Sequence, residues 1–463
     1  MSKTLFSIVI PAYNNAQYLS DAINSVLNQS YPHFELLVVN DASPDNAAEV
    51  IKSFSDPRVR YIEHEVNQGL SAARNTGISN AVGDYIALLD GDDYFHPEKL
   101  KAHAEFLEKN PEVSVTYNAR FELNHSAKTI REIWRPPTSV SMMDVVCGFP
   151  FGPSDMVVQR ELALRINMFD KYYVYVGEDL DFNCRLALAG AKFASVNRTL
   201  NYRRYHSSRR ISNIPYFVDC TFRAMKSAFA DPRCPQVVRD SQEQAFASHY
   251  ILWSAIAFTQ DDTVLGQEYC LAAIRGNPSY LSGRPNQLLN TLISFSIVDD
   301  SLDHEELLLK MFAQLPSEVS SLADQSDWAI GRGYLLRFVR AMMWDRMEDA
   351  QTYFERACSW KACIDQAFLQ YFSIQILSYQ MEFGKEKAQD LLERISPYLE
   401  QLGSKDDVRS MKDHYWVNDA FYSYSFKEYD HVPSAVLSAF FHDPAIVRNR
   451  GLIKIFLNSL IQR

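Results

Sequence analysis

The sequence predicts an α/β fold, a Rossmann-like and mostly parallel sheet flanked by helices, followed by an all-α domain. Short apolar runs alternate with segments of helical periodicity over roughly the first quarter of the chain. Such alternation is typical of βα units, which place parallel strands between two layers of helices. After about residue 215 the strand signals stop and amphipathic helical stretches follow one another. We therefore expect two domains, residues 1–215 and 216–463.

The expected strands are short and wholly apolar, as buried strands of a parallel sheet are. Pro11 closes the first strand, and Pro32 ends the helix that follows it. A later helix opens at Gly69-Leu70-Ser71 and runs to about Ala81. Strands are expected at residues 6–10, 34–39, 58–63, 85–89 and 113–117, with helices between them. Residues 120–170 are rich in turns and aromatic residues and give no clear pattern.

Three aspartates follow the fourth expected strand, in the order Asp90-Gly91-Asp92-Asp93. Open α/β sheets bind their ligands beyond the carboxyl ends of their strands. Carboxylate oxygens on a tight turn suit Mg²⁺ or Mn²⁺, and these cations hold phosphate oxygens. A surface turn would also explain the pattern, because a D-x-D motif is common by itself. The turn therefore indicates a metal diphosphate site only together with its surroundings.

The composition narrows the class of protein. The chain has 463 residues, 47% of them hydrophobic, and a formal net charge of −11. That charge argues against a nucleic-acid partner and against binding to anionic lipid by charge alone. The seven cysteines show no metal-binding spacing, as expected of reduced thiols in a cytoplasmic protein. The N-terminal apolar run is too short for a signal peptide and no run suits a transmembrane helix, so we expect at most peripheral membrane contact.

Dinucleotide binding is the first alternative for a sheet of this kind. It needs the pattern G-x-G-x-x-G after the first strand, but residues 11–15 read Pro-Ala-Tyr-Asn-Asn. The sequence has no P-loop either. The phosphates of a nucleotide must then be held in another way, and a cation on Asp90 and Asp92 supplies one.

The sequence resembles the inverting glycosyltransferases of family 2, which have the nucleotide-sugar-binding type A (GT-A) fold. The resemblance rests on five blocks in the family's order and at its usual spacing, namely residues 7–14, 38–43, 67–75, 90–93 and 177–179. It covers roughly residues 5–205, under half of the chain. Asn40 departs from the pattern, because many members carry an aspartate there, while Asp41 matches the family's base-contacting acid.

The resemblance implies which residues bind the donor. The donor site would consist of Pro11, Ala12 and Tyr13 under the nucleotide base, Asp41 on a base N–H, Arg74 near the base or phosphates, and Asp90 on the ribose or the metal shell. Asp92 would ligate the metal directly, and Asp93 would cap a helix or support the metal ligands. From the residues alone, Asp41 is also compatible with a helix N-cap and Arg74 with a solvated helix face.

Transfer to a hydroxyl also needs a carboxylate base on the face opposite the leaving group. By resemblance Asp179 is that base, and Glu178 is an acceptor-side or orienting group. Two acids at a helix N-terminus are also favourable to the helix dipole without any catalytic role. Residues 199–213 form the densest basic patch and resemble the family's closing segment, in which His206 would complete the metal shell and arginines would clamp the diphosphate. A surface histidine beside arginines is the alternative for His206.

The C-terminal half contains one internal match. Residues 271–278 and 437–444 each combine a helical run with an Asn-Pro or Asp-Pro stop, and each is followed by an arginine and a similar helix. This pattern looks like degenerate tetratricopeptide repeats, which stack as helical hairpins. One ordinary helical bundle is the alternative.

Together with the resemblance, these observations indicate a cytoplasmic glycosyltransferase that needs Mn²⁺ or Mg²⁺ and inverts the anomeric centre. The donor is expected to be a nucleotide sugar, and the choice of a UDP-sugar rests on its frequency in the family. The acceptor is expected to be a bacterial surface glycan, or a protein docked on the C-terminal helices. A partner enzyme and a second copy of the chain are the other expected partners of these helices. The alternatives are a nucleotidyltransferase, which would need a glycine- and lysine-rich loop after the first strand, and a non-catalytic helical scaffold with a degenerate transferase domain.

Overall fold

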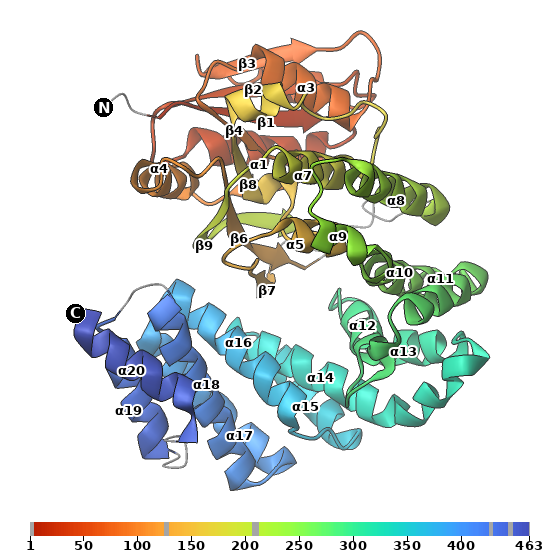
Figure 1. Cartoon of the computed structure of the whole chain (residues 1–463), viewed down its shortest axis with the longest axis vertical. Helices are drawn as coiled ribbons and strands as arrows, with labels where there is room; N and C mark the ends of the chain where they lie inside the picture. The colour runs from red at the N-terminus through yellow and green to blue at the C-terminus, as the bar shows by residue number, and fades with distance from the viewer. Residues whose placement is uncertain (1–3, 125–128, 206–212, 426–428, 443–447, 463) are drawn as a thin grey trace. The chain divides into compact units, whose positions relative to one another are not determined.

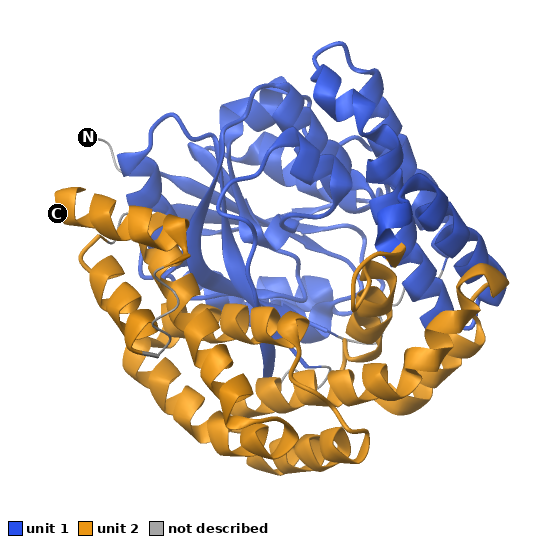
Figure 2. Ribbon diagram, turned by 60° about the horizontal axis from the view of Figure 1, so that its bottom comes forward, with its two compact units in different colours: residues 1–280 blue, residues 281–463 orange. Residues whose placement is uncertain are grey.

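The computed structural model describes residues 4–124, 129–205, 213–425, 429–442 and 448–462 (Figure 1). The chain divides into two compact units, residues 1–280 and 281–463 (Figure 2). The described residues of the first unit include one sheet of nine strands, and those of the second unit form helices. This confirms the expected class, an α/β sheet flanked by helices and followed by an all-helical region.

The first four strands form the parallel half of the sheet, in the order β3-β2-β1-β4. Their bounds are β1 (Phe6–Ala12), β2 (Phe34–Asn40), β3 (Val59–Glu63) and β4 (Tyr85–Leu88). The helices that connect them are α1 (Ala16–Leu27), α2 (Ala47–Lys52) and α3 (Leu70–Asn80). All four strands lie within a residue or two of the expected positions, because each is a short apolar run with a distinct end.

Beyond β4 the strand directions alternate, so the complete sheet is mixed. β8 is antiparallel to β4 and to β6, β9 is parallel to β6, and β5 and β7 pair with β9 and β6 in the antiparallel sense. These strands are β5 (Tyr94–Phe95), β6 (Val115–Leu123), β7 (Ile130–Trp134), β8 (Met156–Gln159) and β9 (Phe193–Arg204). The sequence did not predict β7 and β8. Charged side chains interrupt the apolar pattern at the end of β6 and along β7. Arg120 and Glu122 of β6, for example, pair with each other inside the fold.

The two faces of the sheet have separate apolar cores. Phe6, Ile8 and Ile10 of β1 pack with helices α1 and α2, while Val9 points to the opposite face. The other helices that lie between strands β5 and β9 in the chain, or border them, are α4 (Lys99–Lys109), α5 (Met142–Cys147), α6 (Arg160–Arg165), α7 (Glu178–Leu188) and the 3₁₀ helix η1 (Pro153–Asp155). This alternation of side chains along β1 is what buries the strand on both sides.

The core on the Val9 side extends well beyond residue 215. It includes Met225, Trp253 and Ala257, which lie on helices that follow the sheet. These helices are α8 (Ile214–Ala230), α9 (Gln236–Asp240), α10 (Gln242–Thr259) and α11 (Thr263–Gly276). The boundary expected after residue 215 therefore coincides with the end of the sheet, whereas the compact unit continues to residue 280.

The second unit is built from helices that pack as neighbouring pairs, such as α14 with α15 and α18 with α19. They are α12 (Gln287–Ser296), α13 (His304–Ala313), α14 (Ser326–Met343), α15 (Met347–Ser359), α16 (Gln366–Phe383), α17 (Lys385–Leu402), α18 (Lys405–Ser425), α19 (Val432–His442) and α20 (Arg450–Gln462), with 3₁₀ helices η3 (Pro278–Leu281) and η4 (Ser317–Gln325). The first copy of the internal match spans α11 and α12, on either side of the unit boundary, and the second spans α19 and α20. A tetratricopeptide relationship stays a prediction. In the part of the chain that the structure describes, no helix is both long and apolar enough to cross a membrane.

Candidate active site

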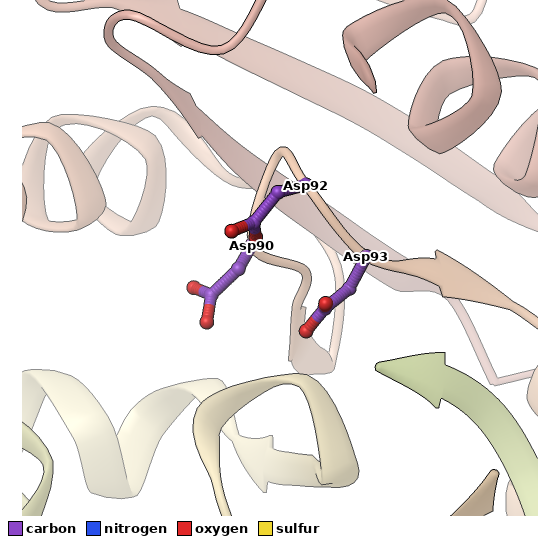
Figure 3. Close-up of side chains that lie close together, drawn as sticks. All are labelled: Asp90, Asp92 and Asp93. Atoms are coloured by element: carbon purple, nitrogen blue, oxygen red, sulfur yellow. The ribbon is translucent and has the colours of Figure 1, made fainter. Parts of the chain in front are cut away.

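Three carboxylates gather on the turn that follows β4. Ligand atoms of Asp90, Asp92 and Asp93 all lie within 4.8 Å of one another, and Figure 3 shows the three side chains on one side of the turn. The turn is packed closely, since a Cβ on Gly91 would meet Asn15 Nδ2 at 2.3 Å. Hard oxygen ligands held this near to one another fit a small divalent cation.

Asp93 differs from the other two because its carboxylate is buried and engaged within the protein. Its oxygens accept hydrogen bonds from the backbone N–H of Arg204 at 3.1 Å and from Ser154 Oγ at 3.2 Å. Arg204 Nη1 also donates to the carbonyl oxygen of Asp92 at 2.9 Å. Arg204 and Ser154 therefore hold the turn in place through Asp93.

A cavity of about 510 Å³ lies at the carboxyl edge of the parallel strands, where ligands of such sheets bind. Its size is within the usual range for small-molecule sites. It brings together residues from four of the predicted blocks. The predicted site residues among them are Pro11, Ala12, Tyr13, Asp41, Asp90 and Asp92, and the block 67–75 contributes Gly69 and Leu70. Tyr13 is 43% exposed and offers an aromatic face, whereas Pro11 and Ala12 are buried.

Asp41 anchors the loop that leads into α3. Its carboxylate accepts hydrogen bonds from the backbone N–H groups of Gln68 and Gly69, both at 2.8 Å, and lies 2.6 Å from His64 Nδ1. The helix N-cap alternative is therefore wrong for Asp41; Asp45 instead accepts from Ala47 N–H at the start of α2. Since a carboxylate has about four acceptor positions, one of them on Oδ2 is left for a ligand.

Arg74 is fully buried, so the alternative that it faces solvent is wrong. Its guanidinium donates to Asp90 Oδ1 at 2.7 Å and to Glu178 Oε1 at 2.8 Å. Burial opposes its charge, but the carboxylates of Asp90 and Glu178 raise the pKa of Arg74 above its ordinary value. Arg74 thus joins the acid turn after β4 to the start of α7.

Helix α3 also fixes the segment that leads into α7. Asn75 exchanges two hydrogen bonds with the backbone of Phe169, at 2.7 and 2.9 Å, and Ser71 Oγ donates to the carbonyl oxygen of Tyr173 at 2.5 Å. Gly69, with φ of +89°, permits a close approach in which a Cβ would meet Val174 Cγ1 at 2.6 Å. Sequence reasoning assigned no role to Ser71 and Asn75. Their spacing of four residues on a helix of small side chains was the available signal.

A second cavity, of about 380 Å³, adjoins the first because Leu70 and Asp90 line both. Its lining includes Arg74, Glu178 and Asp179. Burial, and then the negative charge of Glu178, raise the pKa of Asp179 to about 7. A carboxylate with a pKa near the working pH is suited to accept a proton in a reaction.

The far wall of the second cavity includes Arg120 and Asp155, which sequence reasoning missed. Arg120 donates to Asp155 Oδ2 at 2.6 Å and to Glu122 Oε1 at 2.7 Å. Lys99, which does not itself line the cavity, is buried and donates to Asn118 Oδ1 at 2.6 Å and to the carbonyl oxygen of Ser154 at 2.9 Å. Charged residues at positions 120 and 122, two apart on one strand face, were the signal for Arg120 in the sequence. Residues 149 and 151–154, which also line this cavity, belong to the stretch rich in turns and aromatic residues at 120–170.

His206 lies outside the described residues, as do the arginines that follow it in the basic patch. Within that patch Arg204 is described and points into the protein, where it pairs with Asp21 as well as with the acid turn. It is thus a structural support of the turn in this structure.

The fold and the site together define an α/β domain with a mixed sheet, an acid turn after β4 and two adjoining cavities beside that turn. Residues 7–171, which run from β1 to just before α7, match the family model described as Glycosyl transferase family 2. This stretch, which is less than half of the chain, is thus similar to the family that the resemblance named. Glu178 and Asp179 lie shortly after the matched range.

Several curated proteins share this part of the chain. An uncharacterized glycosyltransferase of Rickettsia conorii is 37% identical over 134 residues, which are 29% of this chain and 22% of that protein. The putative teichuronic acid biosynthesis glycosyltransferase TuaG of Bacillus subtilis is 29% identical over 168 residues, 36% of this chain and 66% of its own length. The chain thus spans about a fifth of the first relative and about two thirds of the second. A solved structure, S. aureus TarS 1–349 in complex with UDP-GlcNAc, aligns over 73% of this chain and 90% of its own with 17% identity and a TM-score of 0.44.

Proposed function

We propose that this protein is a metal-dependent inverting glycosyltransferase that moves a sugar from a nucleotide diphosphate donor, a UDP-sugar, to an acceptor hydroxyl. The observation that carries the proposal is the pair of cavities that meet at Asp90. One is lined by the acid turn and the expected base-binding residues, and the other by Asp179. A donor in the first cavity would place its anomeric carbon toward the second.

The three carboxylates fit a divalent cation such as Mn²⁺ or Mg²⁺, because their oxygens already lie within 4.8 Å of one another. When bound, the cation would neutralise the charge that develops on the leaving diphosphate. Asp92 would hold it, with Asp90 beside it on the same turn. Arg74 keeps Asp90 oriented through the 2.7 Å ion pair.

On the donor side, the residues of this chain bind and orient. Pro11 and Ala12 form a buried floor, Tyr13 offers a ring face to the base, and Asp41 keeps one acceptor position for a base N–H. The choice of a UDP-sugar rests on the resemblance to family 2.

On the acceptor side, Asp179 accepts the proton of the attacking hydroxyl. Glu178 is held by Arg74 at 2.8 Å, so it is positioned rather than free to rotate, and its charge helps to set the raised pKa of Asp179. A single displacement with the base opposite the leaving group inverts the anomeric centre. The presence of the complete acid set argues against a degenerate, non-catalytic domain.

For the metal shell we also propose His206, on its position in the sequence directly after β9. Histidine is a good ligand for Mn²⁺ in mixed oxygen and nitrogen sites. The substitution His206→Ala should raise the Mn²⁺ concentration needed for half-maximal rate. A metal titration that superimposes on that of the unmodified protein would remove His206 from the site.

We propose a growing bacterial surface glycan as the acceptor, consistent with the relative named for teichuronic acid biosynthesis. The helical unit would recruit this acceptor or a protein partner, in the cytoplasm. Stacked helical pairs offer extended surfaces for such a task.

The test is a thermal-shift screen of nucleotides and nucleotide sugars with and without Mn²⁺, because a ligand of the native state raises the unfolding temperature. We expect a uridine nucleotide to stabilise the protein only with the cation. NMR of the product with the best donor then reports the anomeric configuration. No stabilisation by any nucleotide, or a retained configuration, would contradict the proposal.

A further inference from the structure

The hairpin formed by α19 and α20 carries an uncovered apolar surface. One side of the hairpin packs on α18 through a small core that includes Val432, Ala435, Leu452 and Ile455. A groove of about 360 Å³ between the two helices is lined only by apolar side chains, among them Leu437, Phe440, Ile453 and Leu457. Figure 1 shows the two helices side by side at the blue end of the chain.

Apolar side chains also project around this groove. Phe441 and Ile461 are 80% and 82% exposed. Of the 20 large apolar side chains exposed among the described residues, seven fall within this one hairpin. Single exposed apolar residues are ordinary on a protein surface, but a contiguous group marks an interaction site.

The hairpin segment, residues 432–463, has a positive net charge, whereas the net charge of the whole chain is negative. Helices α19 and α20 contain no aspartate or glutamate, and residues 432–463 hold one acidic residue, Asp443, and four basic ones, Arg448, Arg450, Lys454 and Arg463. Arg448, Arg450 and Lys454 are exposed. The whole chain has a net charge of −11, so this cationic apolar hairpin stands out locally.

We propose that this hairpin docks on the surface of an anionic lipid bilayer. Exposed apolar side chains flanked by basic residues on an amphipathic helix are what an anionic membrane interface binds. Helix α20 has 13 residues and is about 20 Å long, too short to cross the hydrocarbon region, so it lies in the plane of the interface. The negative net charge of the whole chain by itself argues against binding to anionic lipid. It does not govern this contact, because salt screens charges that lie more than about a Debye length from the membrane surface.

A second copy of the chain fits the hairpin less well. A two-fold interface places the same surface against itself. Arg448, Arg450 and Lys454 of the two copies would then approach one another with no acid on either helix to pair them, and such like charges oppose association. An anionic lipid surface instead supplies the missing negative charge.

The test uses the full-length protein and vesicle co-sedimentation. Vesicles of phosphatidylcholine alone are compared with vesicles that also contain phosphatidylglycerol, at low and high salt. The charge variant is Arg450→Glu with Lys454→Glu, and its matched control is Lys387→Glu with Lys405→Glu, which changes the net charge equally at exposed positions of the same unit. A third variant, Phe441→Ser with Leu457→Ser and Ile461→Ser, removes apolar contact without touching buried residues.

We expect binding to the phosphatidylglycerol vesicles that weakens at high salt. The charge variant should lose at least roughly 30-fold in partitioning, since each basic residue contributes about fivefold, while the control variant keeps most of it. The apolar variant should also lose binding. Thermal unfolding of each variant shows that it is folded.

Three outcomes would overturn the proposal. They are no binding to either type of vesicle, equal loss in the charge variant and its control, and a dimer in sedimentation that the apolar variant abolishes while vesicle binding is absent. The last result would assign the hairpin to self-association. None of these measurements depends on whether the first unit transfers a sugar.

Discussion

Arg74 Nη1 and Glu178 Oε1 lie 2.8 Å apart, although the two residues are 104 positions apart in the chain. The same guanidinium holds Asp90, so one buried cation orders the acids of both cavities. Arg74→Met should therefore lower the free energy of unfolding by about 3–5 kcal/mol, because it leaves two carboxylates without their partner. Urea unfolding measures the change.

The matched control is Arg60→Met, which removes an exposed ion pair with Glu35 and should cost at most about 1 kcal/mol. Adding Glu178→Gln to Arg74→Met should recover part of the loss. An Arg74→Met protein as stable as the Arg60→Met control would mean that the buried pair is not structural.

Asp92→Asn should abolish both donor hydrolysis and transfer, because the diphosphate charge then lacks a held cation. Calorimetric titration of Mn²⁺ into the donor complex should show weakened binding in the variant. The control is Asp84→Asn, which removes an exposed carboxylate just before the start of β4. Full activity in excess chelator would remove the metal from the mechanism.

Asp179→Asn should leave donor affinity nearly unchanged and lower turnover by roughly 10²–10⁴, the usual contribution of a positioned base. In the unmodified protein, turnover should rise with pH up to about 7, the pKa to which burial and Glu178 raise Asp179, because only the carboxylate can accept the proton. A flat pH profile below neutrality would assign the base to another residue.

The raised pKa of Asp179 also makes the folding stability depend on pH. The folded protein holds the Asp179 proton more tightly than the unfolded chain does, so stability from this group is present at low pH and is lost as pH rises toward about 7. Asp179→Asn does not titrate. Its stability relative to the unmodified protein should therefore increase between pH 4 and pH 7 in chemical unfolding without metal, and a constant difference would contradict the shift.

The buried Lys99 should make the protein more stable as pH rises, the opposite of the trend for Asp179. Burial lowers its pKa to about 7, so above neutrality the folded protein has released a proton that the unfolded chain keeps. The stability of the unmodified protein relative to Lys99→Met should then increase as pH rises above about 7. Lys101→Met, at an exposed position on the same helix, should show no such trend. Equal pH dependence in the two variants would contradict the buried, proton-releasing state of Lys99.

The fragment 1–280 should fold and bind the donor, whereas a fragment that ends at residue 230 should not fold. The core of the first unit includes Trp253 and Ala257 on α10 and Tyr269 on α11, which the shorter fragment lacks. Solubility, circular dichroism and donor binding compare the two. Transfer to the native acceptor should fall in the 1–280 fragment if the helical unit recruits it. A soluble, donor-binding 1–230 fragment would show that α10 and α11 are dispensable.

The sequence was sufficient for those features that are local in the chain. The strands β1 to β4 are apolar runs with distinct ends, and the acids at 90–93 follow one of them directly. The five family blocks then indicated the function, since their order and spacing are linear properties. The residues so assigned to the donor line the first cavity, except Arg74, which lines the second.

Tertiary structure alone decided how the blocks are connected. Whether Asp41 caps a helix or anchors the loop at Gly69 depends on a partner 28 residues away, and whether Arg74 faces water or bridges two acids depends on Glu178. Likewise β7 and β8 are not apparent in the sequence. Charged side chains of β6 next to β7 are neutralised by pairs that form only on folding, such as Arg120 with Glu122, and β8 is a run of only four residues. A pattern along the chain records which side chains are apolar; it does not record which charged groups meet, since that depends on contacts between distant segments.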